Sequence, residues 1–477
     1  MTESPSLPLC VDLDGTLIRT DSLVESVLEL LRRRPFAALL MPFWLMKGKV
    51  GFKSEIASRI ALSPATLPYR ENLVTWLREQ ARVRPVYLAT AAHRSIAEPI
   101  AQYVGCFSGV IATHSTNLSA HDKATALVEQ FGERQFDYAG NSKDDLPVWQ
   151  KARHAIVVGA PGSLVGLVRS ERNVDYEFDT GSQAGPGALR SLIHVLRPHQ
   201  WIKNLLVFLV PLAAHRIFED QVLVAGVLAF IAFCLAASGT YVINDLLDLA
   251  ADRAHPRKRL RPFAAGNVPL MTGIIAGPLL LGLAFTVSVA VGFAFTLVLV
   301  TYAVLTVAYS NWLKRMIFVD VVLLAVFYAL RVVAGAVATE IELSFWLLSV
   351  CAYGFLSLAL LKRYAELLSM DDTQRDLAPG RGYRAADRTI VLALGIGTGL
   401  VCSLVVALYI DSSVSHARYS HPEFLWVLVV LTVMGVGRLW LVAGRGEMHD
   451  DPILFVVRDP ASLALLAAGA GSVLLAV

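Results

Sequence analysis

The second part of the chain, residues 196–477, is a series of long apolar runs, and no other feature limits the fold as much. About nine runs stand out, near residues 204–220, 222–243, 270–289, 291–309, 318–339, 345–363, 389–410, 424–442 and 461–477. A helix needs roughly 20 apolar residues to cross the hydrocarbon core of a bilayer, where the backbone must satisfy its own hydrogen bonds. The runs therefore predict an all-α polytopic membrane domain, although Pro211 and His215 interrupt the first run.

The first part of the chain has a different composition. The whole chain is 55% hydrophobic and 17% charged, whereas soluble domains average roughly 25% charged residues, and most of the apolar excess lies beyond residue 195. Four short segments with the character of buried strands, separated by helical stretches, lie at 7–13, 85–90, 135–139 and 155–158. Strands that alternate with helices predict a parallel sheet in an α/β, Rossmann-like domain.

These patterns predict the domain boundaries. We expect a soluble domain over residues 1–180, with a small helical cap at about 20–80, and a membrane domain over 196–477. A linker is expected at 181–195, because the chain near residue 180 is rich in glycine and lacks bulky side chains.

An unusually apolar stretch lies inside the predicted cap, at residues 36–46. It is too short to span a bilayer. It either packs in the core of the cap or lies at a membrane surface, and packing in the core is the favoured interpretation.

The charges in the loops predict the orientation in the membrane. The formal net charge of +3 says little about partners, but loops 244–269, 310–317 and 364–388 carry many Lys and Arg while the alternate loops carry almost none. Basic loops favour the cytoplasmic side. We therefore expect a multi-pass protein of the bacterial inner (plasma) membrane whose soluble domain and active sites face the cytoplasm. The basic residues flank the membrane, so no nucleic-acid partner is expected. A homo-oligomer is compatible with the sequence.

A cluster of metal-ligand side chains ends the second apolar run. If the segment is helical, Asp245, Asp248 and Asp252 share one face, and Asn244 lies beside them. Such oxygen ligands suit Mg²⁺, which binds substrate phosphates through a few carboxylates, and basic residues as far as Arg261 suit the remaining phosphate charge. The alternative is a solvated helix end, which is disfavoured because neighbouring carboxylates repel each other unless a cation lies among them.

Residues 12–16, Asp-Leu-Asp-Gly-Thr, follow the first predicted strand. In such a pair one carboxylate attacks phosphorus, and the second protonates the leaving oxygen and later activates water. A solvated loop is the alternative, and the apolar strand before it argues against that interpretation. The segment resembles the first motif of the haloacid dehalogenase (HAD) superfamily, which makes Asp12 and Asp14 candidate catalytic residues.

The HAD resemblance covers about residues 7–180 and implies further roles. Thr90 stands where the family holds phosphate, Lys123 where its phosphate-neutralising lysine lies, and Asp145 matches the second acid of its metal-binding pair. Asn141 replaces the first acid, which leaves a weakened or degenerate phosphatase as an alternative. The resemblance implies one Mg²⁺ site, formed by Asp12, Asp14, Asn141 and Asp145.

Residues of about 190–477 resemble the UbiA superfamily of intramembrane transferases, through the Asp-rich segment and the number of helices. Finer matches at 197–204, 252–262, 309–331 and 361–366 resemble its decaprenyl-phosphate phosphoribosyltransferase branch. A second Mg²⁺ site is implied at the catalytic candidates Asp245, Asp248 and Asp252 together with Asn244. The expected substrate-binding residues are Arg197, Lys203, Asn244, Lys258, Arg261, Tyr309, Lys314, Asp320, Arg331, Lys362, Arg363 and Glu366. For any single cation in this set, the alternative is an anchor at the membrane surface.

Two members of this set lie in or at the start of an apolar helix, where ionisable residues are functional candidates. Asp320 and Arg331 are about three turns apart, so they share a face but are too distant for direct pairing. An acid on another helix is the alternative partner of Arg331.

The UbiA resemblance implies transfer of 5-phosphoribose from phosphoribosyl diphosphate to a polyprenyl (decaprenyl) phosphate. A HAD phosphatase on the same chain suits removal of the 5-phosphate, which gives polyprenyl-phosphoryl-ribose, a precursor of arabinose donors for the cell wall. The alternative is a prenyltransferase with a prenyl diphosphate donor, a small aromatic acceptor and a regulatory or degenerate HAD domain. Such enzymes carry a second Asp-rich motif, and the acidic cluster of Glu366, Asp371 and Asp372 is not a clean copy of it.

Overall fold

The computed structural model describes residues 7–113, 118, 120–171, 174–178, 186–368, 382–448 and 451–477. Contacts divide the chain into two compact units, one of Met1–Leu196 with Tyr241–Gly277, the other of Arg197–Thr240 with Pro278–Val477. The Asp-rich segment therefore belongs to the same unit as the α/β domain. Most of the glycine-rich linker segment, together with Asp371 and Asp372, lies outside the described residues.

The α/β domain contains one parallel sheet, as the alternating pattern predicts. Its spatial order is β3-β2-β1-β4-β5-β6, and every pairing is parallel. The strands are β1 (Leu9–Val11), β2 (Val86–His93), β3 (Gly109–Thr113), β4 (Asp137–Gly140), β5 (Ala155–Val158) and β6 (Val174–Phe178). Four of them match predicted strands, and β3 and β6 are additional.

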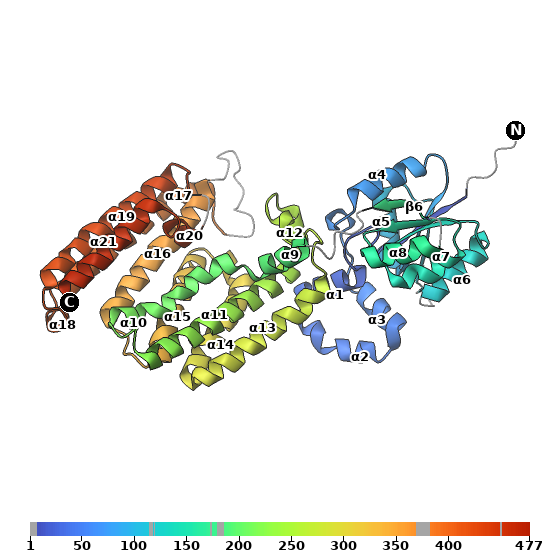
Figure 1. The fold of residues 1–477 in the computed structure, drawn as a ribbon. Coiled ribbons are helices and arrows are strands. Elements are labelled where there is room, and N and C mark those ends of the chain that lie inside the picture. Colours follow the sequence, from blue (N-terminus) through green and yellow to red (C-terminus); the bar gives the residue numbers. More distant parts are fainter. Residues whose placement is uncertain are drawn as a thin grey trace. The chain divides into compact units, whose positions relative to one another are not determined.

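Successive residues of the central strand feed two different cores, because side chains alternate across a sheet. Leu9 and Val11 pack with one cluster of apolar residues, and Cys10 between them packs with another that includes Trp149. Helices cover both faces (Figure 1). They are α5 (Arg94–Val104), α6 (Ala120–Phe131), α7 (Leu146–Lys151) and α8 (Gly162–Glu171), and α9 (Pro186–Leu196) follows β6.

The predicted cap is helical, but its apolar stretch is not a buried core. The cap segment contains α1 (Ser22–Arg33), the 3-10 turn η1 (Pro35–Leu39), α2 (Met41–Leu45), α3 (Gly48–Ala57), η2 (Pro64–Thr66) and α4 (Glu71–Gln80). Ala37 and Trp44 do pack with Leu30 and Ile56. The favoured prediction is nevertheless wrong for most of the stretch, because so small a cap buries only one side of η1 and α2. Six large side chains stay exposed: Phe36, Leu39, Leu40, Phe43, Leu45 and Met46.

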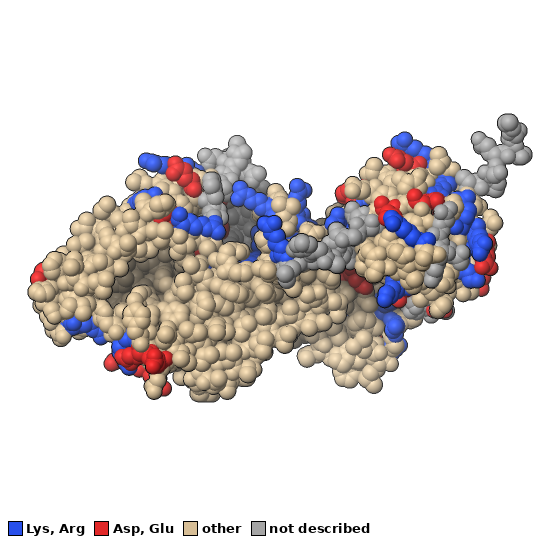
Figure 2. Space-filling model, in the orientation of Figure 1, with Lys and Arg blue, Asp and Glu red and all other residues tan. Residues whose placement is uncertain are grey.

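The membrane part is all-helical, and seven of the described helical segments are long and apolar enough to span a bilayer. They are Asp220–Leu247 (α11), Leu270–Val291 (α13), Phe293–Asn311 (α14), Val319–Thr339 (α15), Phe345–Leu368 (α16), Ala385–Ile410 (with α17, Arg388–Ile410) and Pro422–Gly444 (with α19, Trp426–Gly444). Figure 2 shows an almost uncharged surface over α11, α13 and α14. An uncharged surface of this extent suits contact with lipid.

The count is lower than nine because the first and last predicted runs form shorter elements. The first folds as a 3-10 helix, η4 (Pro198–Phe208), followed by α10 (Leu209–Ala213), and the last is the 17-residue α21 (Pro460–Ala476). Short helices α18 (Ser413–Arg418) and α20 (Pro452–Val456) connect longer ones. Proline within the first run fits its early interruption.

Two aromatic-rich clusters form the core of the second unit. Phe233, Phe295 and Phe327 bring α11, α14 and α15 together. Trp440 of α19 packs with residues of α16 and α17, where Gly395 allows the close approach: a Cβ there would lie 2.1 Å from the Trp440 ring.

Candidate active sites

The first site forms at the carboxyl ends of the central strands. Asp12 and Asp14 follow β1, Thr90 lies in the second half of β2, and Asn141 follows β4. These strands are neighbours, with β1 between β2 and β4. The carboxyl edge at such a switch point is where open parallel sheets bind ligands.

Lys123 of α6 joins the acids of this site. Its ammonium donates a hydrogen bond to Asp12 Oδ1 at 2.7 Å and lies 3.6 Å from Asp145 Oδ1. Burial alone would lower the pKa of Lys123, but the two carboxylates raise that pKa above its ordinary value. The lysine therefore stays charged between two buried acids. The structure thus brings Lys123 next to Asp12, although 111 positions separate them in the sequence.

Tyr138 was missed by sequence reasoning. Its hydroxyl accepts a hydrogen bond from Lys123 at 2.9 Å and donates one to Asp145 Oδ1 at 2.8 Å. The other oxygen of Asp145 accepts from the backbone N–H groups of Asn141 and Ser142. Tyr138 lies within a buried strand, where an aromatic residue signals only packing.

Asp14 forms a hydrogen bond with the start of the cap. Its Oδ1 accepts from the Ser22 backbone N–H at 2.7 Å, at the first turn of α1. Burial raises the pKa of Asp12 to about 6 and that of Asp14 to about 7. Gly15 makes the turn possible: its φ is +75°, and a Cβ there would lie 2.2 Å from Asn141 Nδ2.

The residues at this edge fit a hard divalent cation. Asp12, Asp14, Asn141 and Asp145 offer only oxygen donors, which Mg²⁺ prefers. Asp145 already binds Lys123, Tyr138 and backbone amides, so its oxygens are less free than those of Asp12 and Asp14. The side-chain oxygen of Asn141, Oδ1, accepts a hydrogen bond from the Thr16 hydroxyl at 3.3 Å.

A cavity of about 650 Å³ opens beside Asp14 within the first unit. Arg70 and Asn141 line it from the α/β domain, and residues 266–272 line it from the segment that follows the Asp-rich motif. Arg70 is buried and donates to the Gly15 carbonyl. The cavity therefore leaves room beside Asp14 and Asn141 for a substrate larger than inorganic phosphate.

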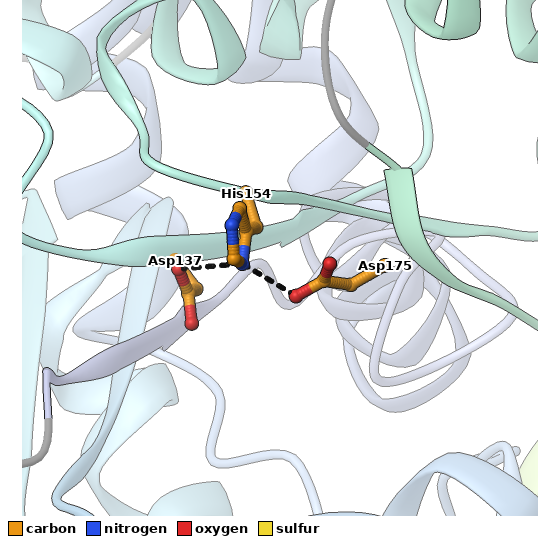
Figure 3. Close-up of side chains that lie close together, drawn as sticks. All are labelled: Asp137, His154 and Asp175. Atoms are coloured by element: carbon orange, nitrogen blue, oxygen red, sulfur yellow. Dashed lines mark ion pairs between the residues drawn. The ribbon is translucent and has the colours of Figure 1, made fainter.

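A second acidic group of this domain is a structural cluster. Asp137, His154 and Asp175 lie close together (Figure 3), with His154 Nδ1 2.6 Å from Asp175. Asp137 also forms ion pairs with Arg84 and Arg153. Two guanidinium groups already neutralise its buried carboxylate, and it starts β4 rather than ending it, so this cluster offers little to a cation or to the site.

The Asp-rich segment is helical with one break. Asn244 and Asp245 lie in the last turn of α11, Asp248 separates the helices, and Asp252 lies in α12 (Leu249–Ala254). Backbone hydrogen bonds run from Asp248 to Asn244 and from Asp252 to Asp248. The four residues therefore keep nearly helical spacing.

Arg261 is the cation among these carboxylates. Its Nη1 lies 3.1 Å from Asp245 Oδ1 and 2.6 Å from Asp252 Oδ2, and both acids are buried. Burial raises the pKa of Asp252, an effect that Arg261 opposes. Lys258, in the adjacent turn η5 (Lys258–Leu260), is exposed. The segment is thus a compact acidic site with its own counter-ion, and its oxygen donors fit Mg²⁺.

Arg253 of α12 ties this segment into the first unit. It forms a buried ion pair with Glu25 of α1, at 2.6 Å, and donates to the carbonyl oxygens of Thr66 and Ala264. Arg253 therefore positions the Asp-rich segment against the α/β domain. The charge pattern alone did not distinguish this role from binding of a substrate phosphate.

In the second unit, two predicted cations share one acid. Lys203 Nζ lies 2.7 Å from Asp451 Oδ2, and Lys362 Nζ lies 3.2 Å from the same oxygen. Sequence reasoning missed Asp451, which is 248 positions from Lys203. The two ammonium groups outnumber the carboxylate, so the group keeps a net positive charge suited to an anion.

The two ionisable residues of α15 have separate partners, as their spacing predicts. Asp320 forms a fully buried ion pair with Arg363 and accepts from the Tyr383 hydroxyl at 2.8 Å. Arg363 also pairs with Glu366. Arg331 donates to Asn204 Oδ1 at 2.8 Å and to the Tyr302 hydroxyl at 3.1 Å, so its described partners are neutral.

The remaining predicted residues are spread over the second unit. Arg197 is the partly buried first residue of the unit, with φ of +52°. Tyr309 of α14 packs its ring 5.6 Å from Phe327, and Lys314 lies in η6 (Leu313–Arg315).

Comparison with known proteins gives matches over both halves of the chain. Residues 205–458 match the UbiA prenyltransferase family. The uncharacterized protein y4nM of Sinorhizobium fredii is 37% identical over 96% of this chain and 88% of its own length. That match runs through the soluble and membrane parts alike.

Two further relatives match a smaller share of the chain. Nodulation protein NoeC of Azorhizobium caulinodans is 34% identical over 57% of this chain and 88% of its own length. Decaprenyl-phosphate phosphoribosyltransferase of Mycolicibacterium smegmatis is 34% identical over 61% of this chain and 94% of its own length.

Proposed function

Because the chain belongs to the UbiA prenyltransferase family and is a multi-pass membrane protein, we propose that it transfers 5-phosphoribose from phosphoribosyl diphosphate to a polyprenyl phosphate. The observation that carries this proposal is the 34% identity to a decaprenyl-phosphate phosphoribosyltransferase along 94% of that enzyme. The charges of the candidate sites supply physical support.

The Asp-rich segment suits the donor. Asn244, Asp245, Asp248 and Asp252 would hold Mg²⁺, which would neutralise the diphosphate as it leaves. The C1–O bond to diphosphate breaks, and an oxygen of the acceptor phosphate forms the new bond to C1. That oxygen is already anionic, so no strong base is needed, and holding two anions together supplies much of the rate. We assign Lys258 and Arg261 of this segment to binding of the donor, and Lys203 and Lys362 of the second unit to binding of an acceptor phosphate.

The soluble domain suits removal of the 5-phosphate from the product. Asp12 attacks phosphorus while Asp14 protonates the departing sugar oxygen, and water then releases inorganic phosphate from the aspartyl intermediate with Asp14 as the base. A pKa of Asp14 raised to about 7 suits both proton transfers. Thr90 and Lys123 would hold the phosphate, and Mg²⁺ at the sheet edge would neutralise its charge.

The final product would be polyprenyl-phosphoryl-ribose, on the cytoplasmic side of a bacterial inner membrane. Such a lipid suits an arabinose-donor pathway for the cell wall.

Lipid-product mass spectrometry tests both halves. Purified protein in nanodiscs would receive phosphoribosyl diphosphate, Mg²⁺ and polyprenyl phosphate. Wild type should form polyprenyl-phosphoryl-ribose, and Asp12→Asn should accumulate the 5-phosphorylated lipid. Asp144→Asn is the matched control, because this exposed carboxylate directly precedes Asp145. Equal product ratios in wild type and Asp12→Asn would sink the tandem scheme, and product formed only from a prenyl diphosphate and an aromatic acceptor would replace it.

A further inference from the structure

The cap exposes a continuous set of large apolar side chains. Phe36, Leu39, Leu40, Phe43, Leu45 and Met46 are each between 50% and 84% exposed. All six lie within eleven consecutive residues, in η1 and α2 or directly after one of them. Elsewhere in the α/β domain, exposed apolar residues such as Val83 and Tyr103 are separated in the chain. Single exposed apolar residues are ordinary, whereas a contiguous patch marks a binding surface.

The patch is the second apolar face of a segment whose other face is already packed. Ala37, Met41 and Trp44 point into the small core under the cap, at helical spacing. Phe36, Leu40 and Phe43 repeat the same spacing one position earlier and lie outside that core. The outward residues are therefore not needed to hold the cap together, and their bulk needs another explanation.

Basic residues flank the patch on both sides. Arg32, Arg33 and Arg34 precede it and Lys47 and Lys49 follow it, all of them exposed, and no acidic residue occurs between Glu29 and Glu55. Glu29 pairs with Arg32 and Arg33, and Glu55 pairs with Lys47, so the five cations still outnumber the two acids. Figure 2 shows the tan surface of the α2 lobe with blue beside it. An apolar face bordered by Lys and Arg is the composition of segments that lie in a membrane interface, with the cations at anionic headgroups.

We propose that this cap face, residues 35–47, inserts into the headgroup region of a bilayer that contains anionic lipids. The chain is a multi-pass membrane protein, so a bilayer is always near it. The docking stands without the proposed reaction, because it rests on exposure and charge alone.

The docked segment continues directly to the catalytic edge. α3 follows the patch, and its Lys53 donates to the Ala91 carbonyl at 2.6 Å, one residue beyond Thr90. A cap fixed at the lipid surface would therefore hold the sheet edge over a phosphate carried by a lipid; this consequence alone rests on the proposed function.

Site-directed spin labelling of the full chain in vesicles tests the docking. A label at Phe43→Cys is compared with one at Val83→Cys, in a Cys106→Ser background because the other four cysteines are buried. In vesicles with phosphatidylglycerol, the label at 43 should collide more with oxygen than with a water-soluble nickel chelate, and the label at 83 should show the reverse. Equal nickel accessibility at both positions would overturn the proposal. Shielding of position 43 from both reagents would also overturn it, since a second copy or another protein surface would then cover the patch.

An activity comparison separates docking from chemistry. Replacing Phe36, Phe43 and Met46 together by Asp should lower hydrolysis of a lipid-linked phosphate in vesicles by about tenfold or more, with hydrolysis of a small soluble phosphate ester unchanged. Val83→Asp should change neither rate. An equal loss on both substrates would contradict a role in lipid access. If wild type hydrolyses neither substrate, the proposed phosphatase fails, and the spin-label result still decides the docking.

Discussion

The α/β domain and the Asp-rich segment both gather carboxylates around one cation of the chain, but they hold that cation differently. Lys123 is almost fully buried between Asp12 and Asp145, and Tyr138 fixes its ammonium. Arg261 lies between Asp245 and Asp252 with about 30% of its side chain exposed, on the loop beyond η5. Lys123 is therefore enclosed by protein, whereas Arg261 is partly exposed.

The difference predicts two ways of handling an anionic substrate. Lys123 cannot leave without stranding two buried carboxylates, so its site is assembled before substrate arrives, as electrostatic preorganisation requires. Arg261 is partly exposed but its two acids are buried, so it can leave them only as another cation arrives; a divalent cation bound to a diphosphate can take its place between the acids. We therefore interpret the first site as fixed and the second as exchangeable.

Removing the exchangeable acids should have the largest effect. Asp245→Asn and Asp252→Asn should each lower transfer of phosphoribose by about 10²–10³-fold, because the leaving diphosphate loses its electrostatic stabilisation. Radiolabelled phosphoribosyl diphosphate measures the rate. Phosphatase activity should stay unchanged in both variants. Asp220→Asn, at the exposed start of the same helix, is the matched control; a comparable loss there would indicate damage to α11 rather than to the site.

Stability should distinguish the two counter-ions directly. Lys123→Met should destabilise the soluble domain by about 3–5 kcal/mol, because two buried carboxylates lose their partner. Arg261→Met should cost less, about 1–3 kcal/mol, because its two acids are also buried but water can reach them from the exposed side of the arginine. Pulse proteolysis of the full chain in urea gives both values. Equal losses would erase the distinction between a fixed and an exchangeable cation.

Metal affinity sharpens the same comparison. Arg261→Gln should strengthen Mn²⁺ binding without substrate by about three- to tenfold, because the metal no longer competes with a guanidinium at the two carboxylates; this corresponds to about 1 kcal/mol. Electron paramagnetic resonance of free Mn²⁺ measures the change. Arg259→Gln, in the adjacent turn and exposed, should leave the affinity as it was. Weaker binding in Arg261→Gln would mean that the arginine supports the metal rather than competes with it.

The smallest effect is expected at the third acidic group. His154→Ala should leave Zn²⁺ and Mn²⁺ binding unchanged and alter phosphatase activity by less than about twofold, since Asp137 already has two arginine partners. Equilibrium dialysis measures the metal. A lost metal equivalent would show that acidic clusters in this chain bind cations even when arginines neutralise them.

Local patterns in the sequence predict much of this arrangement. The apolar strand before Asp12 places its carboxylate at a sheet edge, and the parallel topology brings Thr90 and Asn141 to the same edge. The helical spacing of Asp245 and Asp252 survives the break at Asp248.

Contacts between distant segments were not predictable in the same way. Asp451 pairs with Lys203 and Lys362 only after folding, and Tyr138 has no pattern that separates a catalytic neighbour from a core residue. The prediction that residues 36–46 pack in the core of the cap was wrong for most of them. Hydrophobicity predicts that a side chain avoids water, but it does not predict which surface covers that side chain. β3 is only partly buried, so its residues lack the strong apolar signal of the central strands.

The order of the two reactions is the central claim, and one measurement addresses it directly. Phosphoribosyl diphosphate labelled only at the 5-phosphate would be added to wild-type protein in nanodiscs, with and without polyprenyl phosphate. The account predicts that the label enters the lipid first and then appears as inorganic phosphate, and that no labelled phosphate forms without the acceptor lipid. Release of the label without acceptor, or its permanent retention in the lipid, would contradict the account.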